Sequence, residues 1–233
     1  KQCDMRYDRQ LILPEIGEEG QRKLAQNKIL IVGVGGLGSP ISLYLTGAGV
    51  GTIGLVDDDV VSITNLQRQV LYSESELGMK KAECAAKRLA ALNGDVKVIP
   101  YSTRLTEENA KELIGQYDIV IDGCDNFATR YLINDCCLEL GKVYVYGAIG
   151  GFEGQVSVFN YQGSTNYRTL YPDEKEMTEM PVPSKGVLGV TPAVVGSVEA
   201  NEAIKVICGF GDVLAGKLWT IDLRTMQTNI ILL

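Results

Sequence analysis

The chain has 233 residues, of which 45% are hydrophobic and 22% charged, the ordinary balance of a folded globular protein. Its net charge of -7 argues against general nucleic-acid binding, because such binding requires a broad basic surface. The chain contains no histidine, which excludes imidazole acid–base catalysis, Ser-His-Asp triads and histidine metal sites.

The first half of the chain alternates apolar runs with helical patterns. A helical pattern over 6–27, broken at Gly17, precedes the apolar run 28–34, which is typical of a buried parallel strand. Gly33 to Gly38 then turn the chain into a helix. The elements expected next are helix 39–49, strand 51–56, helix 79–92, strand 95–100, helix 106–114, strand 117–122, helix 126–140 and strand 142–147. This alternation predicts a doubly wound, mostly parallel, Rossmann-like α/β sheet.

The pattern changes in the second half. Short alternating stretches at 154–161 and 217–232 predict antiparallel strands added to the sheet. Residues 162–190 contain three prolines and a charged stretch, so we expect a long loop that crosses over the site. A helix is expected over 192–208.

We expect one domain over 1–233. Its nucleotide-binding half is 1–150, and 151–233 adds the antiparallel strands, the crossover loop and the C-terminal helix and strands. No apolar run approaches the ~20 residues of a membrane span, so no membrane partner is expected. The six cysteines lack the spacing of a disulfide framework and no secretory signal is recognised, so we expect a cytoplasmic protein.

The segment Gly33-Val34-Gly35-Gly36-Leu37-Gly38 follows a predicted strand and begins a predicted helix. Glycines at this spacing let the backbone approach phosphates, and the helix N-terminus supplies free N–H groups. Asp57 follows Gly33 by 57 − 33 = 24 residues and ends the next strand, where a carboxylate binds ribose hydroxyls. These features predict a nucleotide site and by themselves favour NAD or FAD.

Two cations shift the prediction toward a nucleoside triphosphate. Arg68 and Lys81 lie on segments that leave the carboxyl ends of sheet strands. A triphosphate carries roughly four negative charges, and these need more cations than one helix terminus supplies. Asp125 follows another strand and is suited to magnesium, while Asp125 or Asn126 is also a candidate cap of the following helix.

A series of motifs then occurs in one order and spacing. They are Arg6-Tyr7-x-Arg9-Gln10, the segment Gly33 to Gly38, Asp57-x-Asp59, Asn65-Leu66-Gln67-Arg68-Gln69, Gly78-x-Lys80-Lys81, Asp125-Asn126, Gly186-Val187-Leu188-Gly189 and Glu202-Ala203-Ile204-Lys205. In these motifs the chain resembles the ThiF/MoeB/HesA family, the bacterial relatives of ubiquitin-activating enzymes. The resemblance covers nearly the whole chain.

The resemblance implies an ATP-dependent adenylyltransferase. Such enzymes consume ATP and magnesium, activate the C-terminal Gly-Gly of a small ubiquitin-like sulfur-carrier protein and release pyrophosphate. Carried over by motif, the catalytic residues would be Arg9, Arg68, Lys81 and Asp125, with Asp125 holding magnesium. The nucleotide-binding residues would be Gly33, Gly35, Gly36, Gly38, Asp57, Asp59, Asn65, Gln67, Arg68, Lys81, Asp125 and Asn126. In such proteins the residue matching Arg9 reaches the partner subunit's ATP, so a homodimer is implied.

The chain departs from the family in its cysteines. Asn166-Tyr167-Arg168-Thr169 occupies the place of a first zinc-binding Cys-x-x-Cys pair, and Leu233 ends the chain without a second, so no zinc is expected. Some members use a loop cysteine at the position near Val182, but 162–190 contains none, so no covalent acyl step is expected. Cys124 is expected to be a core residue at a strand end.

Three other functions fit part of the pattern. A relative that adenylates a tRNA nucleoside would share the ATP motifs, although the acidic balance argues against it. A nicotinamide-dependent oxidoreductase explains the glycines and Asp57 but gives Arg68, Lys81 and Asp125 no role. A non-catalytic homologue that binds nucleotide without turnover is the third alternative. Carrier-protein adenylation is the function that the sequence favours.

Overall fold

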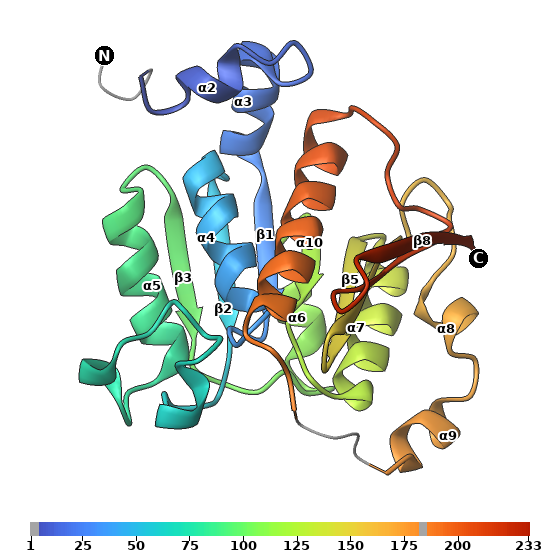
Figure 1. Ribbon diagram of the computed structural model, residues 1–233. Coiled ribbons are helices and arrows are strands. Elements are labelled where there is room, and N and C mark those ends of the chain that lie inside the picture. Colours follow the sequence, from blue (N-terminus) through green and yellow to red (C-terminus); the bar gives the residue numbers. More distant parts are fainter. Residues whose placement is uncertain (1–4, 182–185) are drawn as a thin grey trace.

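A computed structural model describes residues 5–181 and 186–233 (Figure 1). At its centre is an eight-stranded sheet in the order β3-β2-β1-β4-β5-β6-β7-β8. Strands β1 to β5 are parallel, and β6 to β8 are added antiparallel. The bounds are β1 (Lys28–Val32), β2 (Thr52–Val56), β3 (Lys97–Tyr101), β4 (Ile119–Asp122), β5 (Val143–Gly150), β6 (Glu153–Phe159), β7 (Lys217–Asp222) and β8 (Gln227–Leu232). The predicted fold class is confirmed.

Helices cover both faces of this sheet and enclose two apolar cores. One face carries α3 (Gly17–Gln26), α4 (Gly38–Ala48), α5 (Lys81–Leu92) and α10 (Val190–Cys208). The other carries α6 (Ala110–Gly115), α7 (Phe127–Leu140) and α8 (Tyr167–Leu170). Shorter elements are α2 (Asp8–Leu11), α9 (Glu174–Glu179), η1 (Ile63–Asn65) and η2 (Glu74–Glu76). Alternate β1 side chains enter the two cores, which explains its continuous apolar run.

The crossover segment differs from the expected long loop. It contains α8 and α9, and each begins at a side-chain cap: Asn166 Oδ1 accepts the Arg168 N–H at 2.8 Å, and Asp173 Oδ1 accepts the Glu176 N–H at 2.9 Å. The helix expected to begin at residue 192 begins at Val190, because a proline is tolerated in a first turn. The helix expected over 6–27 is split at 12–16, and Gly17 begins α3 instead of breaking a helix.

The N-terminal motif ties α2 to the ends of α4 and α5. The Tyr7 hydroxyl accepts from Asn93 Nδ2 at 2.9 Å, and Gln10 Nε2 donates to the Ala48 carbonyl at 3.2 Å. Arg9 is exposed and forms no ion pair within the described part of the chain. The α2–α3 segment leads into the start of β1, so Arg9 lies at the amino-terminal edge of the parallel strands (Figure 1).

Helix α10 buries two glutamates in different surroundings. Glu202 accepts from Lys205 Nζ at 2.5 Å and from the Leu214 N–H at 2.8 Å. Glu199 is fully buried against β5, where a Cβ on Gly147 would lie 2.1 Å from its Oε1. Neither Glu199 oxygen has a hydrogen-bond partner among the described residues. Burial raises the pKa of this carboxyl well above its usual value, which favours the neutral acid.

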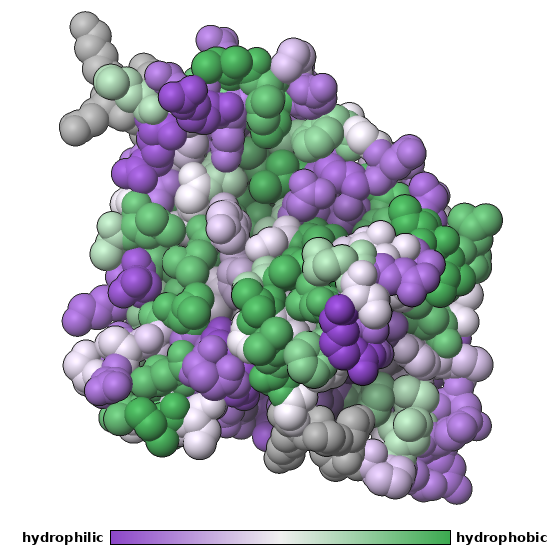
Figure 2. Space-filling model, in the orientation of Figure 1, coloured by the Kyte–Doolittle hydropathy of each residue, from purple (hydrophilic) through white to green (hydrophobic). Residues whose placement is uncertain are grey.

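Strand β8 is one edge of the sheet and is exposed along its length. Its residues Ile230, Ile231 and Leu232 leave apolar surface over this strand, at the right of Figure 2. In residues 5–181 and 186–233, no helix has both the length and the apolar character that a membrane crossing requires.

Candidate functional site

The Gly-rich loop between β1 and α4 adopts a tight turn. Gly33 has a φ of 91°, and a Cβ at this position would lie 2.4 Å from the Gly123 carbonyl oxygen. Asp57 holds the loop, because its Oδ2 accepts the Val34 N–H at 2.8 Å and its Oδ1 accepts the Asp59 N–H at 2.9 Å. Burial raises the pKa of the Asp57 carboxyl. Asp57 therefore shapes the loop as well as facing the cavity beside it.

Gly38 has a packing role. A Cβ on Gly38 would lie 2.2 Å from the Gly33 carbonyl oxygen, so we expect Gly38→Ala to lower the free energy of unfolding by about 1–3 kcal/mol. Gly47 in the same helix is the matched control, since nothing lies within 4 Å of a Cβ there. Gly47→Ala is expected to raise stability by about 0.5–1 kcal/mol. Urea unfolding compares the two variants, and shifts of the same sign would contradict this account.

A cavity of ≈ 700 Å³ opens at the carboxyl ends of β1, β2 and β4. These ends meet at one edge of the sheet because the strands are parallel, so segments distant in sequence converge there. The predicted site residues that line the cavity are Gly33, Gly35, Gly36, Asp57, Asp59, Asn65, Arg68, Lys81, Asp125 and Asn126. Most of the predicted site is thus brought together.

Three predicted residues lie outside the cavity wall. Gly38 is buried within the packing of α4, and Arg9 is at the other edge of the sheet. Gln67 is exposed, and its backbone carbonyl faces the start of α10. Gln69, and not Gln67, lines the cavity, because residues three and four positions after Asn65 share its side of a helical turn.

Four cations of the described residues line the cavity, and Arg68 differs from the rest. Its Nη1 donates to the Thr64 carbonyl at 3.0 Å, and it pairs with no carboxylate of the described residues. The other three are paired: Lys81 with Asp59 at 3.0 Å, Arg104 with Asp58 at 3.3 Å and Arg130 with Asp122 at 3.2 Å. Arg68 therefore has charge available for an anion.

The Gly-rich loop presents donors beside this cation. The backbone N–H groups of Gly35 and Gly36 donate to none of the described residues. A Cβ on Gly36 would lie 3.6 Å from Arg68 Cδ, so the arginine crosses the loop at close range. Unpaired N–H groups, the N-terminus of α4 and a free guanidinium together form a site suited to a phosphate chain.

A buried network holds the loop that follows β4. Asp122 is fully buried and accepts from the Tyr144 hydroxyl at 2.8 Å, from the Cys124 N–H at 2.9 Å and from Arg130 Nε at 3.2 Å. Arg130 Nη2 in turn donates to the Cys124 carbonyl at 3.1 Å. From the sequence, Asp122 was given no role within its acidic segment, and Arg130 was not singled out. The available signal was an arginine placed within the apolar pattern of helix 126–140.

The loop presents Asp125 to the cavity. Asp125 is exposed and has no side-chain partner among the described residues, whereas Asn126 Oδ1 caps α7 by accepting the Thr129 N–H at 2.9 Å. One exposed carboxylate beside a phosphate site fits magnesium, which commonly binds one or two carboxylates with phosphate oxygens and water. Among described residues, no group of three or more His, Cys, Asp or Glu side chains could hold a metal.

The Cys124 side chain points into the Asp122 network. Its Sγ donates to Asp122 Oδ1 at 2.8 Å, and burial raises the pKa of the thiol well above its usual value. A thiol of raised pKa is a poor nucleophile. The predicted core role holds only in part, because Cys124 packs against the core but is partly buried and lines the cavity. The predicted position near Val182 lies outside the described residues, and the expected absence of zinc stays a prediction.

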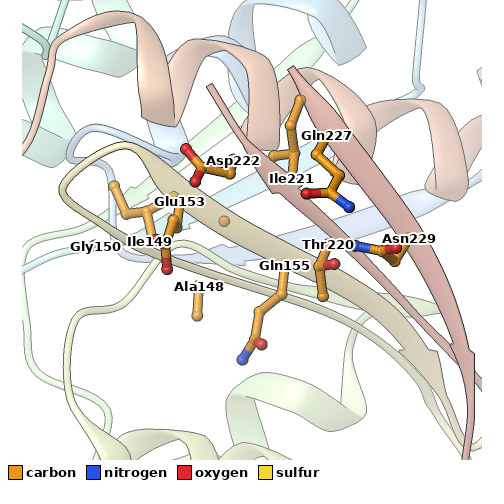
Figure 3. A pocket seen from close by; sticks show the side chains of 11 residues that line it. Ala148, Ile149, Gly150, Glu153, Gln155, Thr220, Ile221, Asp222, Gln227 and Asn229 are labelled. Carbon is orange, nitrogen blue, oxygen red and sulfur yellow. The ribbon is translucent and has the colours of Figure 1, made fainter. Parts of the chain in front are cut away.

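A second cavity, of ≈ 350 Å³, lies on the antiparallel part of the sheet (Figure 3). Its wall contains two cross-strand rows, Ala148-Gln155-Thr220-Asn229 and Gly150-Glu153-Asp222-Gln227. The two cavities share Ala148, Ile149, Gly150 and Gln155. A groove thus runs across strands β8 to β5 and meets the first cavity at β5 and β6.

Comparison with known proteins gives close relatives. Residues 7–233 match the family described as the ThiF family. The chain is 50% identical over 224 residues to a "Probable molybdopterin-synthase adenylyltransferase" from Porphyra purpurea, covering 95% of this chain and 59% of the relative. It is 49% identical over 223 residues to a "Sulfur carrier protein adenylyltransferase" from Thermus thermophilus, covering 93% of this chain and 82% of the relative.

The fold also matches solved structures. The crystal structure of Escherichia coli MccB with ATP superposes with a TM-score of 0.80 at 23% identity, covering 91% of this chain and 65% of that one. At this identity the likeness concerns the fold alone. The match to residues 7–233 and the Thermus thermophilus relative, by contrast, establish the family, and the chain belongs to the ThiF family.

Proposed function

We propose that the chain binds ATP in the ≈ 700 Å³ cavity and adenylates a carboxylate. The observation that carries this proposal is the free guanidinium of Arg68 beside the unpaired N–H groups of Gly35 and Gly36. Lys81 adds a second cation, and its pairing with the exposed Asp59 leaves it able to turn to a phosphate. Asp57 and Asn65 complete the ribose and phosphate contacts.

Asp125 is proposed to hold magnesium, with phosphate oxygens and water as the remaining ligands. The metal supplies charge neutralisation at the phosphates when it is bound. Asn126 fixes the start of α7 and so sets where Asp125 stands.

The proposed second substrate is the C-terminal Gly-Gly carboxylate of a small ubiquitin-like sulfur-carrier protein. The Thermus thermophilus relative, named for this class of substrate, supports the choice. The groove on β5 to β8 supports it structurally, because amide and hydroxyl side chains line it together with the carboxylates of Glu153 and Asp222, and it ends at the nucleotide cavity. An extended peptide needs such partners for its backbone groups.

The proposed reaction needs no general base. A tail carboxylate oxygen forms a bond to the α-phosphorus, the bond to the bridging oxygen breaks, and pyrophosphate leaves with the electron pair. The carboxylate is ionised at neutral pH, so no proton has to be removed. Positioning and charge neutralisation by this chain's cations carry the catalysis, in accord with the absence of histidine.

We further propose a homodimer in the cytoplasm. Arg9 is exposed, unpaired within the described chain and distant from its own cavity, so it is available to a second subunit's ATP. The described cysteines Cys84, Cys124, Cys136, Cys137 and Cys208 are free thiols, as is usual in a reducing compartment.

Nucleotide choice is tested by binding. We expect ATP with magnesium, and not NAD, to raise the thermal unfolding temperature. Arg68→Ala should weaken ATP binding in calorimetry by about tenfold to a hundredfold, because a charge-assisted contact is lost. Arg88→Ala on the exposed side of α5 is the control and should bind ATP as the native chain does. Stabilisation by NAD alone would refute the proposal and favour an oxidoreductase.

A further inference from the structure

Gln155 stands where the two cavities join. It lies on β6, opposite Ala148 on β5 and Thr220 on β7, and it lines both cavities. Figure 3 shows its side chain projecting from the sheet beside Ala148 and Thr220. Ala148 and Gly150 are small, so a peptide backbone has room to approach the sheet at this point. Gln155 has the longest polar side chain of the four residues that line both cavities.

The Gln155 amide nitrogen is fully used within the protein. Nε2 donates to the Tyr146 hydroxyl at 2.6 Å and to the Tyr171 hydroxyl at 2.7 Å, so both of its N–H groups have acceptors. The Gln155 Oε1 atom accepts from none of the described residues, although an amide oxygen has two lone pairs. The free hydrogen-bonding capacity of this side chain is therefore that of an acceptor.

Both tyrosines are themselves fixed. Tyr146 is 1% exposed, and its ring stacks on Phe159 at a centroid distance of 5.6 Å. Tyr171 comes from the crossover segment, and its backbone carbonyl accepts from the Tyr131 hydroxyl at 2.8 Å. Two anchored hydroxyls thus hold the amide in one orientation. Such preorganisation is what a residue that positions a substrate needs.

We propose that Gln155 is a positioning residue for the carrier tail: its Oε1 accepts one backbone N–H of the extended tail just before the terminal carboxylate. This inference rests on the proposed function and names the contact that aligns the tail with the nucleotide. The contact is made to the backbone and not to a side chain. It therefore suits a glycine tail, which has only backbone groups to bind. Tyr146 and Tyr171 act through Gln155.

The test compares carrier proteins carrying a single N-methyl group at each of the last four backbone nitrogens in turn. Methylation removes one N–H donor. In pyrophosphate exchange by the native chain, the carrier methylated at one of these positions should therefore have a KM about three- to tenfold higher than that of the unmodified carrier. Gln155→Ala should raise the KM for the unmodified carrier by a similar factor and abolish the discrimination at that position. The KM for ATP should be unchanged. Comparing the ratios cancels those effects of the methyl group that do not involve Gln155.

Gln227→Ala is the matched control. Gln227 lines the same groove but belongs to the other cross-strand row: it lies on β8 two positions before Asn229, which is in the row of Gln155. It should retain the discrimination. Persistence of the discrimination in Gln155→Ala, or its absence at every position in the native chain, would overturn this inference. No carrier-dependent exchange by the native chain would instead refute the proposed function, so the two failures are distinguishable.

Discussion

Alanine in place of Asp125 is expected to lower carrier-dependent pyrophosphate exchange by at least about a hundredfold and to leave thermal unfolding unchanged. The side chain is exposed and has no described partner, so the fold loses nothing with it. The reaction loses a magnesium ligand and with it charge stabilisation of the transferring phosphoryl group, for which losses of 10²–10³ are typical. Exchange kinetics at saturating carrier and a thermal melt measure the two effects.

Asp125→Asn separates charge from shape, because it keeps the side chain's size and one oxygen. We expect it to lose most of the activity and to recover part of it at high magnesium concentration. Asp212→Ala, on an exposed segment before β7, is the control for loss of one negative charge. Exchange by Asp125→Ala within a few-fold of the native rate would remove Asp125 from the proposed mechanism.

Three residues earlier, Asp122→Ala is expected to lower the free energy of unfolding by about 3–5 kcal/mol. The change leaves Arg130, which is 7% exposed, as a buried charge without its carboxylate. The Tyr144 hydroxyl and the Cys124 N–H lose their acceptor as well. Urea unfolding followed by circular dichroism gives the stability difference.

The double variant Asp122→Leu, Arg130→Met tests the physical reason. Removing both charges should restore at least half of the lost stability, because no unpaired ion remains in the interior. The ATP cavity would still lose its ordered Cys124–Asp125 loop, so activity should not return. A stability loss below about 1 kcal/mol in Asp122→Ala would mean that water reaches Arg130 and that the pair is not structurally important.

The parallel half of the fold was predictable because each strand enters two cores. After the exposed Lys28, residues 29–32 of this run are apolar and buried at every position, and this is the pattern that burial on both faces requires. The crossover was harder, because α8 and α9 have only four and six residues and depend on the caps Asn166 and Asp173. Helices this short leave little periodic pattern in a sequence.

The candidate site was predictable where a residue lies within three positions of a strand end, as Asp57 and Asp125 do. The site was not predictable where a residue's place depends on the direction of its side chain within a turn. For this reason the sequence motif predicts Gln67 as a nucleotide-binding residue, whereas Gln69 lines the cavity. Gln155 was missed because its importance arises from β5, β6 and the crossover meeting, and no local pattern encodes such a meeting.

The neutral Glu199 carboxyl gives the fold an unusual response to acid. Its pKa is raised in the folded chain from the ordinary 4.5, so above that pH the folded state holds a proton that the unfolded chain releases. Stability from this residue is therefore greatest below pH 4.5 and declines as the pH rises toward the folded pKa. A paired carboxylate, whose pKa is lowered in the folded chain, loses its stabilising contribution as the pH falls. Glu199 gains stability over the same change in pH and thus opposes acid denaturation.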